Sequence, residues 1–404
     1  MRARLSALPA PARVGAAVVA VHLAWVGAFF AGGHEIRDLI RIGPYYVTRE
    51  VPIKSDVITY DPSYRYPANF DPGRKGDGYD GQFSYYLAID PRHAKFYMDV
   101  PTYRYKRPLY AMTARALALG DPKGIEWTLL IVNILAMFAL TAAMAAWLTR
   151  QGVSPWWGLA FGLTPGLLVS TQRDLTEPLG YALLAGALLA TQALPRRWGW
   201  LAAGVLFGLA GLARQTTLLF GPFLVLALLL EGTGPPRERI RRNAGRALGL
   251  GALALVPYLA WSAWVDAHMH DVFGASDQFT AIPFAGFFNR AFELQRSGVT
   301  LLTVAVPATI LLVLAIALIR RRTALWAALA LAASACVFVI FNVDSNAYPA
   351  RGRAAVGVAF AAVVCLPWLL QLGPAAKRAL LVAAALWFVM LPVIAIYGLS
   401  LKAA

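Results

Sequence analysis

Long apolar segments recur along almost the whole chain, and they constrain its fold more than any other feature. Runs of about 18 or more mainly apolar residues follow one another from Arg13 to the C-terminus, and a helix of that length crosses the roughly 30 Å hydrocarbon core of a bilayer. Only 14% of the 404 residues are charged, whereas a soluble domain has about 25%. The sequence therefore predicts a polytopic membrane protein and excludes a soluble globular one.

The apolar runs predict an all-α fold with eleven membrane spans in a single integral-membrane domain that covers residues 1–404. Two segments outside the spans are long enough to carry a function, a first outer loop at 33–126 and a second at 266–299. Both cysteines lie inside apolar runs, so they predict neither a disulfide framework nor a metal site. The expected spans are 14–32, 127–148, 155–172, 178–194, 198–213, 217–231, 247–265, 299–319, 324–341, 354–370 and 379–399.

The distribution of charge predicts the orientation of these spans. With the N-terminus in the cytoplasm, the inner side carries 16 Lys and Arg residues against two acidic residues, Glu231 and Glu238, and the outer side carries 21 against 19. The opposite orientation would place RERIRR at 237–242 and RRR at 320–322 outside, against the positive-inside rule. Most of the net charge of +16 thus lies at the inner face, where Lys and Arg residues bind anionic membrane lipids. It does not indicate nucleic-acid binding.

The first outer loop has the composition of an ordered segment. It contains twelve acidic residues, fourteen Lys or Arg residues and many aromatic residues. GQFSYYLAID, which starts at Gly81, has the spacing of a short amphipathic helix that Asp90 and Pro91 end, and PLYAMTARALALG predicts a second helix up to Gly120. We expect both helices to lie at the outer membrane surface, and the first span to be an uncleaved anchor rather than a signal peptide.

Charged residues at the outer ends of the spans are the most informative polar feature, because charges in or beside a membrane are costly. Arginine binds phosphate oxygens in a bidentate manner, and it does so more strongly where the dielectric is low. A site of this composition below an aromatic loop suits a ligand with an anionic head and an apolar tail, such as a polyprenyl-phosphate-linked sugar. The charges at span ends are Arg173, Asp174, Glu177, Arg214, Asp344, Arg351 and Arg353, and the loop adds Asp77, Asp80, Asp90, Arg104 and Arg107.

Transfer of a sugar from such a donor needs two chemical roles. One carboxylate takes the proton of an acceptor hydroxyl while the anomeric carbon leaves its phosphate, and arginines stabilise the charge that develops on that phosphate. A sugar-nucleotide enzyme would show a paired-aspartate metal motif, which the first loop lacks. We therefore expect no metal and no cofactor, and His268 and His270 are expected to be solvated rather than metal ligands.

Five stretches together resemble the GT-C class of integral-membrane glycosyltransferases, and most closely the bacterial relatives of the glycosylphosphatidylinositol mannosyltransferases. YDGQF at 79–83 is similar to the aromatic-Asp motif of the first outer loop, TEPLG at 176–180 to a Ser/Thr-Glu-x-Leu stretch, and ARQTTLL at 213–219 to an arginine-containing turn; YRYKRPLY and AYPARGRAAVGVAF complete the set. Gly81 and Gln82 depart from the family motif and no histidine follows, so the sugar can differ from mannose. The resemblance implies a lipid-phosphate sugar donor and an aspartate of the first loop as catalytic base.

Each candidate residue has a functional interpretation and a structural alternative. Asp80 is the predicted general base, with an N-cap carboxylate as the alternative and Asp77 as a competing base. Donor phosphate binding is assigned to Arg214, Arg351, Arg353, Arg104 and Arg107, of which the last two could instead meet lipid headgroups. Substrate binding is assigned to Asp77, Gln82, Tyr86, Glu177 and Gln215; Tyr86 could instead belong to the interfacial aromatic belt, and Glu177 could serve only to pair with Arg173 or Arg214.

The leading hypothesis is a glycosyltransferase that acts at the outer face of a bacterial inner membrane. Its expected partners are a polyprenyl-phosphate-linked sugar donor, a glycan or lipid acceptor and membrane lipids. A transporter or flippase of a lipid-linked saccharide is the alternative, but it would show repeated halves and interrupted spans with charge at the midplane. A non-catalytic scaffold of an envelope complex would not need convergent arginines and carboxylates.

Overall fold

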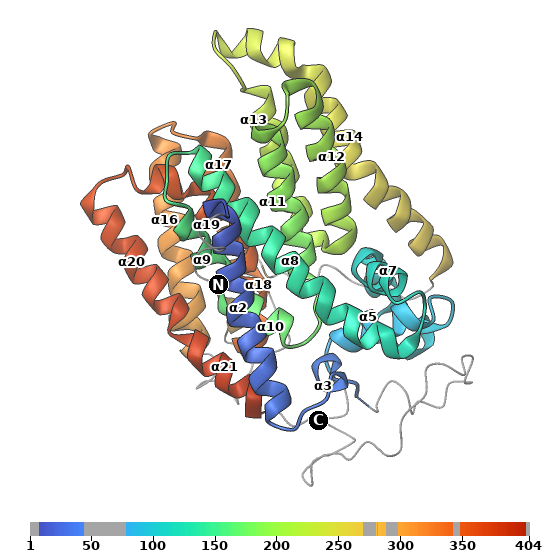
Figure 1. The fold of residues 1–404 in the computed structure, drawn as a ribbon. Coiled ribbons are helices and arrows are strands. Elements are labelled where there is room, and N and C mark those ends of the chain that lie inside the picture. Colours follow the sequence, from blue (N-terminus) through green and yellow to red (C-terminus); the bar gives the residue numbers. More distant parts are fainter. Residues whose placement is uncertain are drawn as a thin grey trace.

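The computed structural model of the chain describes residues 8–43, 78–269, 280, 282–287, 298–341 and 348–400, and these residues form helices joined by turns (Figure 1). The α-helices are α2 (Ala10–Ala31), α3 (Arg37–Ile40), α5 (Gly81–Ile89), α6 (Pro101–Tyr105), α7 (Pro108–Leu117), α8 (Pro122–Arg150), α9 (Gly158–Gly162), α10 (Pro165–Thr171), α11 (Glu177–Ala193), α12 (Arg196–Ala213), α13 (Gly221–Leu229), α14 (Pro236–His268), α16 (Val306–Arg320), α17 (Leu325–Ile340), α18 (Tyr348–Ala354), α19 (Val356–Leu369), α20 (Pro374–Phe388) and α21 (Met390–Ser400). Shorter 3₁₀ or π turns are η1 (Ala94–Tyr97), η2 (Pro155–Trp157), η3 (Gln215–Phe220), η5 (Ala285–Phe287) and η7 (Leu301–Ala305).

Five helical stretches in the described part of the chain are long and apolar enough to cross a membrane, so the chain is a helical, multi-pass membrane protein. They are Ala10–Ala31, Pro122–Arg150, Pro236–His268, Gly298–Arg320 and Pro374–Leu399. A sixth forms if α18 and α19, which meet at a bend of 41°, are counted as one span, and two shorter apolar helices cover Gln215–Leu229 and Leu325–Ile340. Each of these stretches overlaps an expected span.

The expected span at 155–172 is broken in the structure. It consists of η2, α9 and α10, with Leu163 and Thr164 outside any helix. Pro165 explains the break, because a proline disfavours the helical conformation in the residue before it; Thr164 has φ −59° and ψ 131°. The expected spans at 178–194 and 198–213 correspond to α11, of 17 residues, and α12, of 18.

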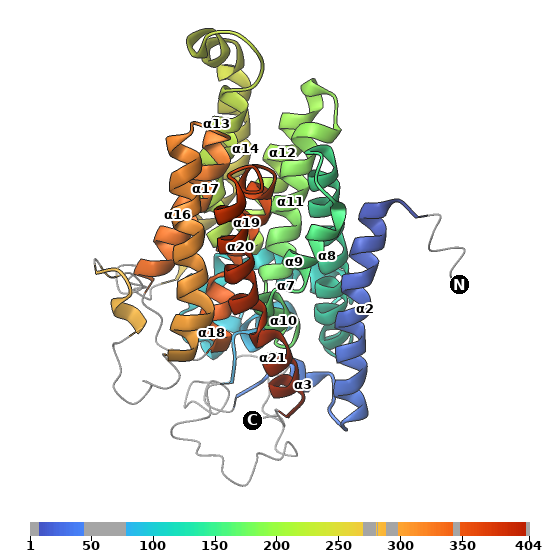
Figure 2. The same cartoon turned by 90° about the vertical axis from the view of Figure 1, so that its left-hand side faces the viewer.

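The helices run side by side (Figure 2), and the segments at the two ends of the bundle differ in composition. In that view α3, α10 and α18 lie towards the lower end, and the connections α11–α12, α13–α14 and α16–α17 lie at the upper end. These upper connections contain the arginine clusters that begin α12 and α14 and end α16. The cluster of acidic and basic residues described below thus lies at the opposite end from the arginine-rich connections.

The first outer loop contains the two short helices that its sequence predicts, α5 and α7, and Asp90 follows the last residue of α5 as expected. Eight of the nine residues of α5 are buried, because apolar side chains surround this helix and pack against α3, α7 and α8. Residues 44–77 of this loop and most of 266–299 lie outside the described residues.

Candidate functional site

Asp80 is placed by a tight turn that precedes α5. Gly78 has a φ of +64°, and the Tyr79 amide donates to the Arg41 carbonyl. Gly81 begins the helix so close to the α10–α11 turn that a Cβ atom there would lie 2.3 Å from the Arg173 carbonyl oxygen. The sequence Gly-Tyr-Asp-Gly therefore fixes Asp80 between the first outer loop and that turn, because only glycine permits this approach.

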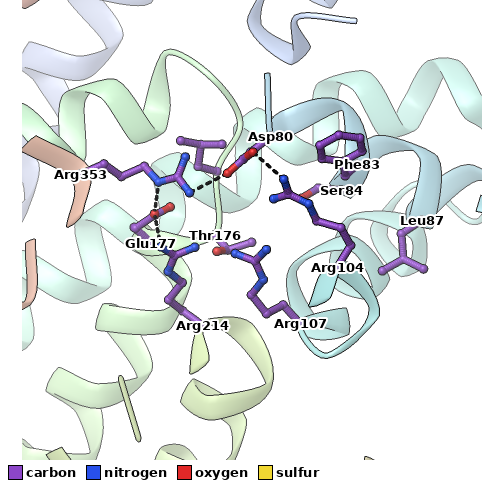
Figure 3. Close-up of a pocket in the computed structure, with 11 residues that line it drawn as sticks. Asp80, Phe83, Ser84, Leu87, Arg104, Arg107, Thr176, Glu177, Arg214 and Arg353 are labelled. Carbon is purple, nitrogen blue, oxygen red and sulfur yellow. Dashed lines mark hydrogen bonds and ion pairs between the residues drawn. The ribbon is translucent and has the colours of Figure 1, made fainter. Parts of the chain in front are cut away.

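The Asp80 carboxylate binds two arginines from distant parts of the chain (Figure 3). Arg353 of α18 donates from Nη2 to Oδ2 at 2.6 Å, and Arg104 of α6 lies with Nη2 3.0 Å from Oδ1. The carboxylate makes no capping hydrogen bond to α5. The N-cap alternative for Asp80 is therefore wrong, because the guanidinium groups take the oxygens that a cap would use.

A second carboxylate, Glu177, continues this arrangement on the other side of Arg353. Its Oε1 lies 2.6 Å from Nε of Arg353 and 3.1 Å from Nη2 of Arg214. Asp80, Arg353, Glu177 and Arg214 thus form a chain of alternating charges across four helical elements, which we call the ion-pair chain (Figure 3). The expected alternative of pairing with Arg214 describes Glu177 correctly, and this pairing places it in the site.

Close packing of α18 on α10 brings Arg353 to this position. A Cβ atom at Gly166 would lie 2.3 Å from the carbonyl oxygen of Gly352, so the two backbones touch where α10 and α18 cross. Arg353, the next residue, then faces the start of α11, where Glu177 is the first residue. Gly166 and Gly352, which are more than 180 positions apart in sequence, meet here because neither residue has a side chain that would separate the two backbones.

Two further cations line the same site from the first outer loop. Arg104 is held by Asp99, to which it donates from Nε at 2.8 Å and from Nη2 at 2.6 Å. Arg107 is 7% exposed, and its guanidinium lies 4.0 Å from the centre of the Tyr103 ring. Among the described residues, no carboxylate lies within ion-pair distance of Arg107. The site therefore contains a buried cation that is available to an anionic ligand.

The arginines control the ionisation of the acidic groups around them. Burial alone would raise the pKa of Asp80, but the charges of Arg104, Arg353 and Arg107 hold that pKa well below its usual range. Burial lowers the pKa of Arg107 to about 10, and the nearby cations Arg214 and Arg104 act in the same direction. Asp80 is thus a firmly ionised carboxylate in the ligand-free protein, and its bound arginines make it a weak base.

Two cavities meet at the ion-pair chain. The smaller cavity is lined by Asp80, Phe83, Ser84, Arg104, Arg107 and Thr176. The larger cavity has mainly apolar walls from η3, α17 and α19, with residues such as Leu219, Phe220, Val337, Phe338 and Val358. Glu177, Arg214 and Arg353 line both cavities. A polar cavity and a larger apolar one therefore share a charged wall.

Of the other predicted site residues, those that the structure describes do not line the smaller cavity with Asp80. Arg351 is fully buried and donates to the Phe341 and Gly286 carbonyls, so it lines neither cavity. Gln82 is fully buried and accepts from the Gly43 amide at 2.9 Å, and Tyr86 packs inside the loop. Gln215 lines the larger cavity and accepts from the Tyr258 hydroxyl at 3.3 Å. Asp77, like Asp344 and His270, lies outside the described residues.

Sequence reasoning missed four residues that shape the site. Tyr103 lies beneath Arg107 and lines the larger cavity, and Tyr79 meets Arg353 Nη1 at 3.4 Å through its hydroxyl. Ser84 and Thr176 line the smaller cavity. Tyrosines interleaved with cations in YRYKRPLY were a signal for Tyr103, whereas no local pattern distinguishes Ser84 or Thr176 from other hydroxyl residues.

The described part of the chain contains no group of three His, Cys, Asp or Glu residues placed to hold a metal ion. No protein-family model matches the chain, and no curated protein matches it. Its function is therefore inferred from the geometry of the site. Four arginines and two carboxylates there can bind an anion, hold it beside an ionised carboxylate, and leave an apolar cavity open next to it.

Proposed function

We propose that the protein is a GT-C glycosyltransferase with eleven membrane spans, related to the bacterial relatives of the glycosylphosphatidylinositol mannosyltransferases. It transfers one sugar from a polyprenyl-phosphate donor to a glycan or lipid acceptor on the periplasmic side of a bacterial inner membrane. Asp80 is the general base. Arg107, Arg214, Arg353 and Arg104 surround the donor phosphate.

The observation that carries this proposal is the charged wall shared by the two cavities. An isoprenoid chain suits the larger apolar cavity, and a phosphate at Arg214 and Arg353 would stand at the boundary between the two spaces. The sugar then enters the smaller cavity, where Asp80, Ser84 and Thr176 offer polar partners. A ligand with an anionic head, an apolar tail and one sugar matches all three parts of this arrangement.

The chemistry follows from the position of Asp80. An acceptor hydroxyl in the smaller cavity gives its proton to the Asp80 carboxylate while its oxygen attacks the anomeric carbon. The bond between that carbon and the phosphate oxygen breaks, and its electron pair stays on the phosphate. Buried guanidinium groups stabilise the resulting charge, because they are already oriented and need no solvent reorganisation.

A transporter of a lipid-linked saccharide is the second candidate, and the break at Thr164 favours it, because interrupted spans are typical of transporters. The charged residues of the site lie elsewhere, however. They gather around Asp80 at one end of the bundle, where the described chain also places the helices of the first outer loop. This placement favours chemistry at the membrane surface over passage through the bundle.

Replacement of Asp80 tests the enzyme directly. The purified chain in nanodiscs is given a panel of undecaprenyl-phosphate-linked hexoses and pentoses with envelope glycan and lipid fractions, and released undecaprenyl phosphate is measured. Asp80→Asn should lower the release by about 10²–10⁴-fold, the usual contribution of a general base, and leave lipid-phosphate binding within a few fold. Asp90→Asn makes the same chemical change at the far end of α5 and should keep activity.

Two results would contradict the proposal. If Asp80→Asn retains full transfer, the base is another residue, with Glu177 the next carboxylate in the site. If the wild-type chain releases no undecaprenyl phosphate but moves the lipid-linked sugar between the two leaflets of a vesicle, the protein is a transporter.

A further inference from the structure

The ion-pair chain suggests how the donor controls the base, an inference that rests on the proposed function. Arg353 uses all three of its guanidinium nitrogens within the protein: Nε meets Glu177, Nη2 meets Asp80 and Nη1 meets the Tyr79 hydroxyl. These contacts use three of the five N–H donors of the guanidinium, so an anion can first bind at the remaining two and then compete with these partners for Arg353.

The partners of Arg353 differ in how firmly the protein holds them. The Glu177 side chain is 1% exposed, so after release from Arg353 it would stay out of reach of water, with Arg214 as its remaining ion-pair partner. The Asp80 side chain is 28% exposed and keeps a second arginine, Arg104, when Arg353 leaves. Release of Asp80 therefore costs less than release of Glu177.

The remaining cations give the anion its first point of attachment. Arg107 is buried without a carboxylate partner in the described part of the chain, and Nε of Arg214 is buried without a hydrogen-bond partner. Both residues line the smaller cavity beside Arg353. A phosphate bound by Arg107 and Arg214 thus arrives next to the guanidinium that holds Asp80.

We propose that Arg353 is a positioning residue that keeps Asp80 inactive until a lipid phosphate binds, takes over the guanidinium and frees the carboxylate. The donor then binds before the acceptor, and the carboxylate becomes an effective base only when a leaving phosphate is present. Arg353 exchanges one anionic partner for another, so no guanidinium is left uncompensated at any stage.

The test measures how the Asp80 carboxyl group responds to undecaprenyl phosphate that carries no sugar. A water-soluble carbodiimide with an amine labels protonated carboxyl groups, and mass spectrometry quantifies the label on Asp80 across pH in the full-length chain in nanodiscs. The charged or titratable groups that face Asp80 are Arg104, Arg107, Arg353, Tyr79 and Tyr103, together with Glu177 beyond Arg353. Glu126, which pairs with Arg37 at 2.8 Å outside both cavities, is the internal control.

Saturating lipid phosphate should raise the labelling rate of Asp80 by about tenfold, the change that one pKa unit gives, and leave Glu126 unchanged. Arg353→Gln should show high Asp80 labelling without the lipid and little further response to it, whereas Arg37→Gln should behave like the wild type at Asp80. If the lipid binds, as native mass spectrometry of the same sample reports, and Asp80 labelling does not rise, the coupling is refuted and the proposed function stands. If no lipid phosphate binds to the wild-type chain, the proposed function itself fails.

Discussion

Arg107 is the residue whose energetics depend most on a ligand, since it is buried with an aromatic ring and without a carboxylate partner among the described residues. Hydrogen bonds to a charged group contribute about 1.5–3 kcal/mol, so Arg107→Ala should weaken binding of undecaprenyl phosphate by about 10–100-fold. The same change removes an uncompensated buried charge and should raise the unfolding temperature of the ligand-free protein. Arg92→Ala, at an exposed arginine of the same loop, should change neither quantity, and equal effects of the two substitutions would refute the assignment.

Asp80 is the residue whose ionisation should make the stability depend on pH. Its pKa is lower in the folded protein than the value of about 4 in an unfolded chain. Its ion pairs therefore stabilise the folded protein above about pH 4. That contribution is lost as the pH falls through the pKa that Asp80 has in the folded protein. The unfolding temperature of the wild type in detergent should fall below about pH 4, and it should fall less steeply in Asp80→Asn. Parallel curves for the two proteins would show that Asp80 is not held by the arginines.

Helix α5 can approach the α10–α11 turn only because it begins with a glycine. Gly81→Ala would place a Cβ atom 2.3 Å from the Arg173 carbonyl oxygen, so the helix must move. A backbone shift of this kind costs about 1–3 kcal/mol, and it should also lower transfer activity because Asp80 precedes Gly81. Gly27→Ala is the matched control, since a Cβ atom at this position in α2 has no neighbour within 4 Å. A Gly81→Ala protein with wild-type activity and stability would contradict the proposed placement of Asp80.

The two ends of the molecule differ in their charged residues, and this difference predicts its orientation in the membrane. The arginine-rich connections lie at one end of the bundle, and α18, whose Arg353 binds Asp80, lies towards the other (Figure 2). Cytoplasmic loops carry the excess of Lys and Arg. A cysteine at Arg92, in the first outer loop, should react with a membrane-impermeant maleimide in intact spheroplasts. A cysteine at Arg197, in the α11–α12 connection, should react only after permeabilisation. The reverse pattern would place the cavity in the cytoplasm and contradict the proposed donor.

Prediction from sequence succeeded where the signal is local. Apolar runs located the long helices, and the spacing in GQFSYYLAID located α5. It could not show what distant segments decide. Helix α5 is enclosed by α3, α7 and α8, and Arg351 and Arg353, two positions apart, face different surroundings. A helical turn of 3.6 residues rotates positions i and i+2 by about 200°, so the same motif gave one arginine of the site and one packing arginine.

The sequence by itself determined that this chain is a helical membrane protein with acidic and basic residues at the ends of its spans, because hydropathy and charge act through the surrounding solvent and need no knowledge of neighbours. The tertiary structure alone decided which of those residues meet. Asp80, Glu177, Arg214 and Arg353 come together where Gly81 touches the Arg173 backbone and Gly166 touches Gly352. These contacts form only because Gly81 and Gly166 have no side chain where the backbones approach each other. The pattern of charges along the sequence does not predict such contacts.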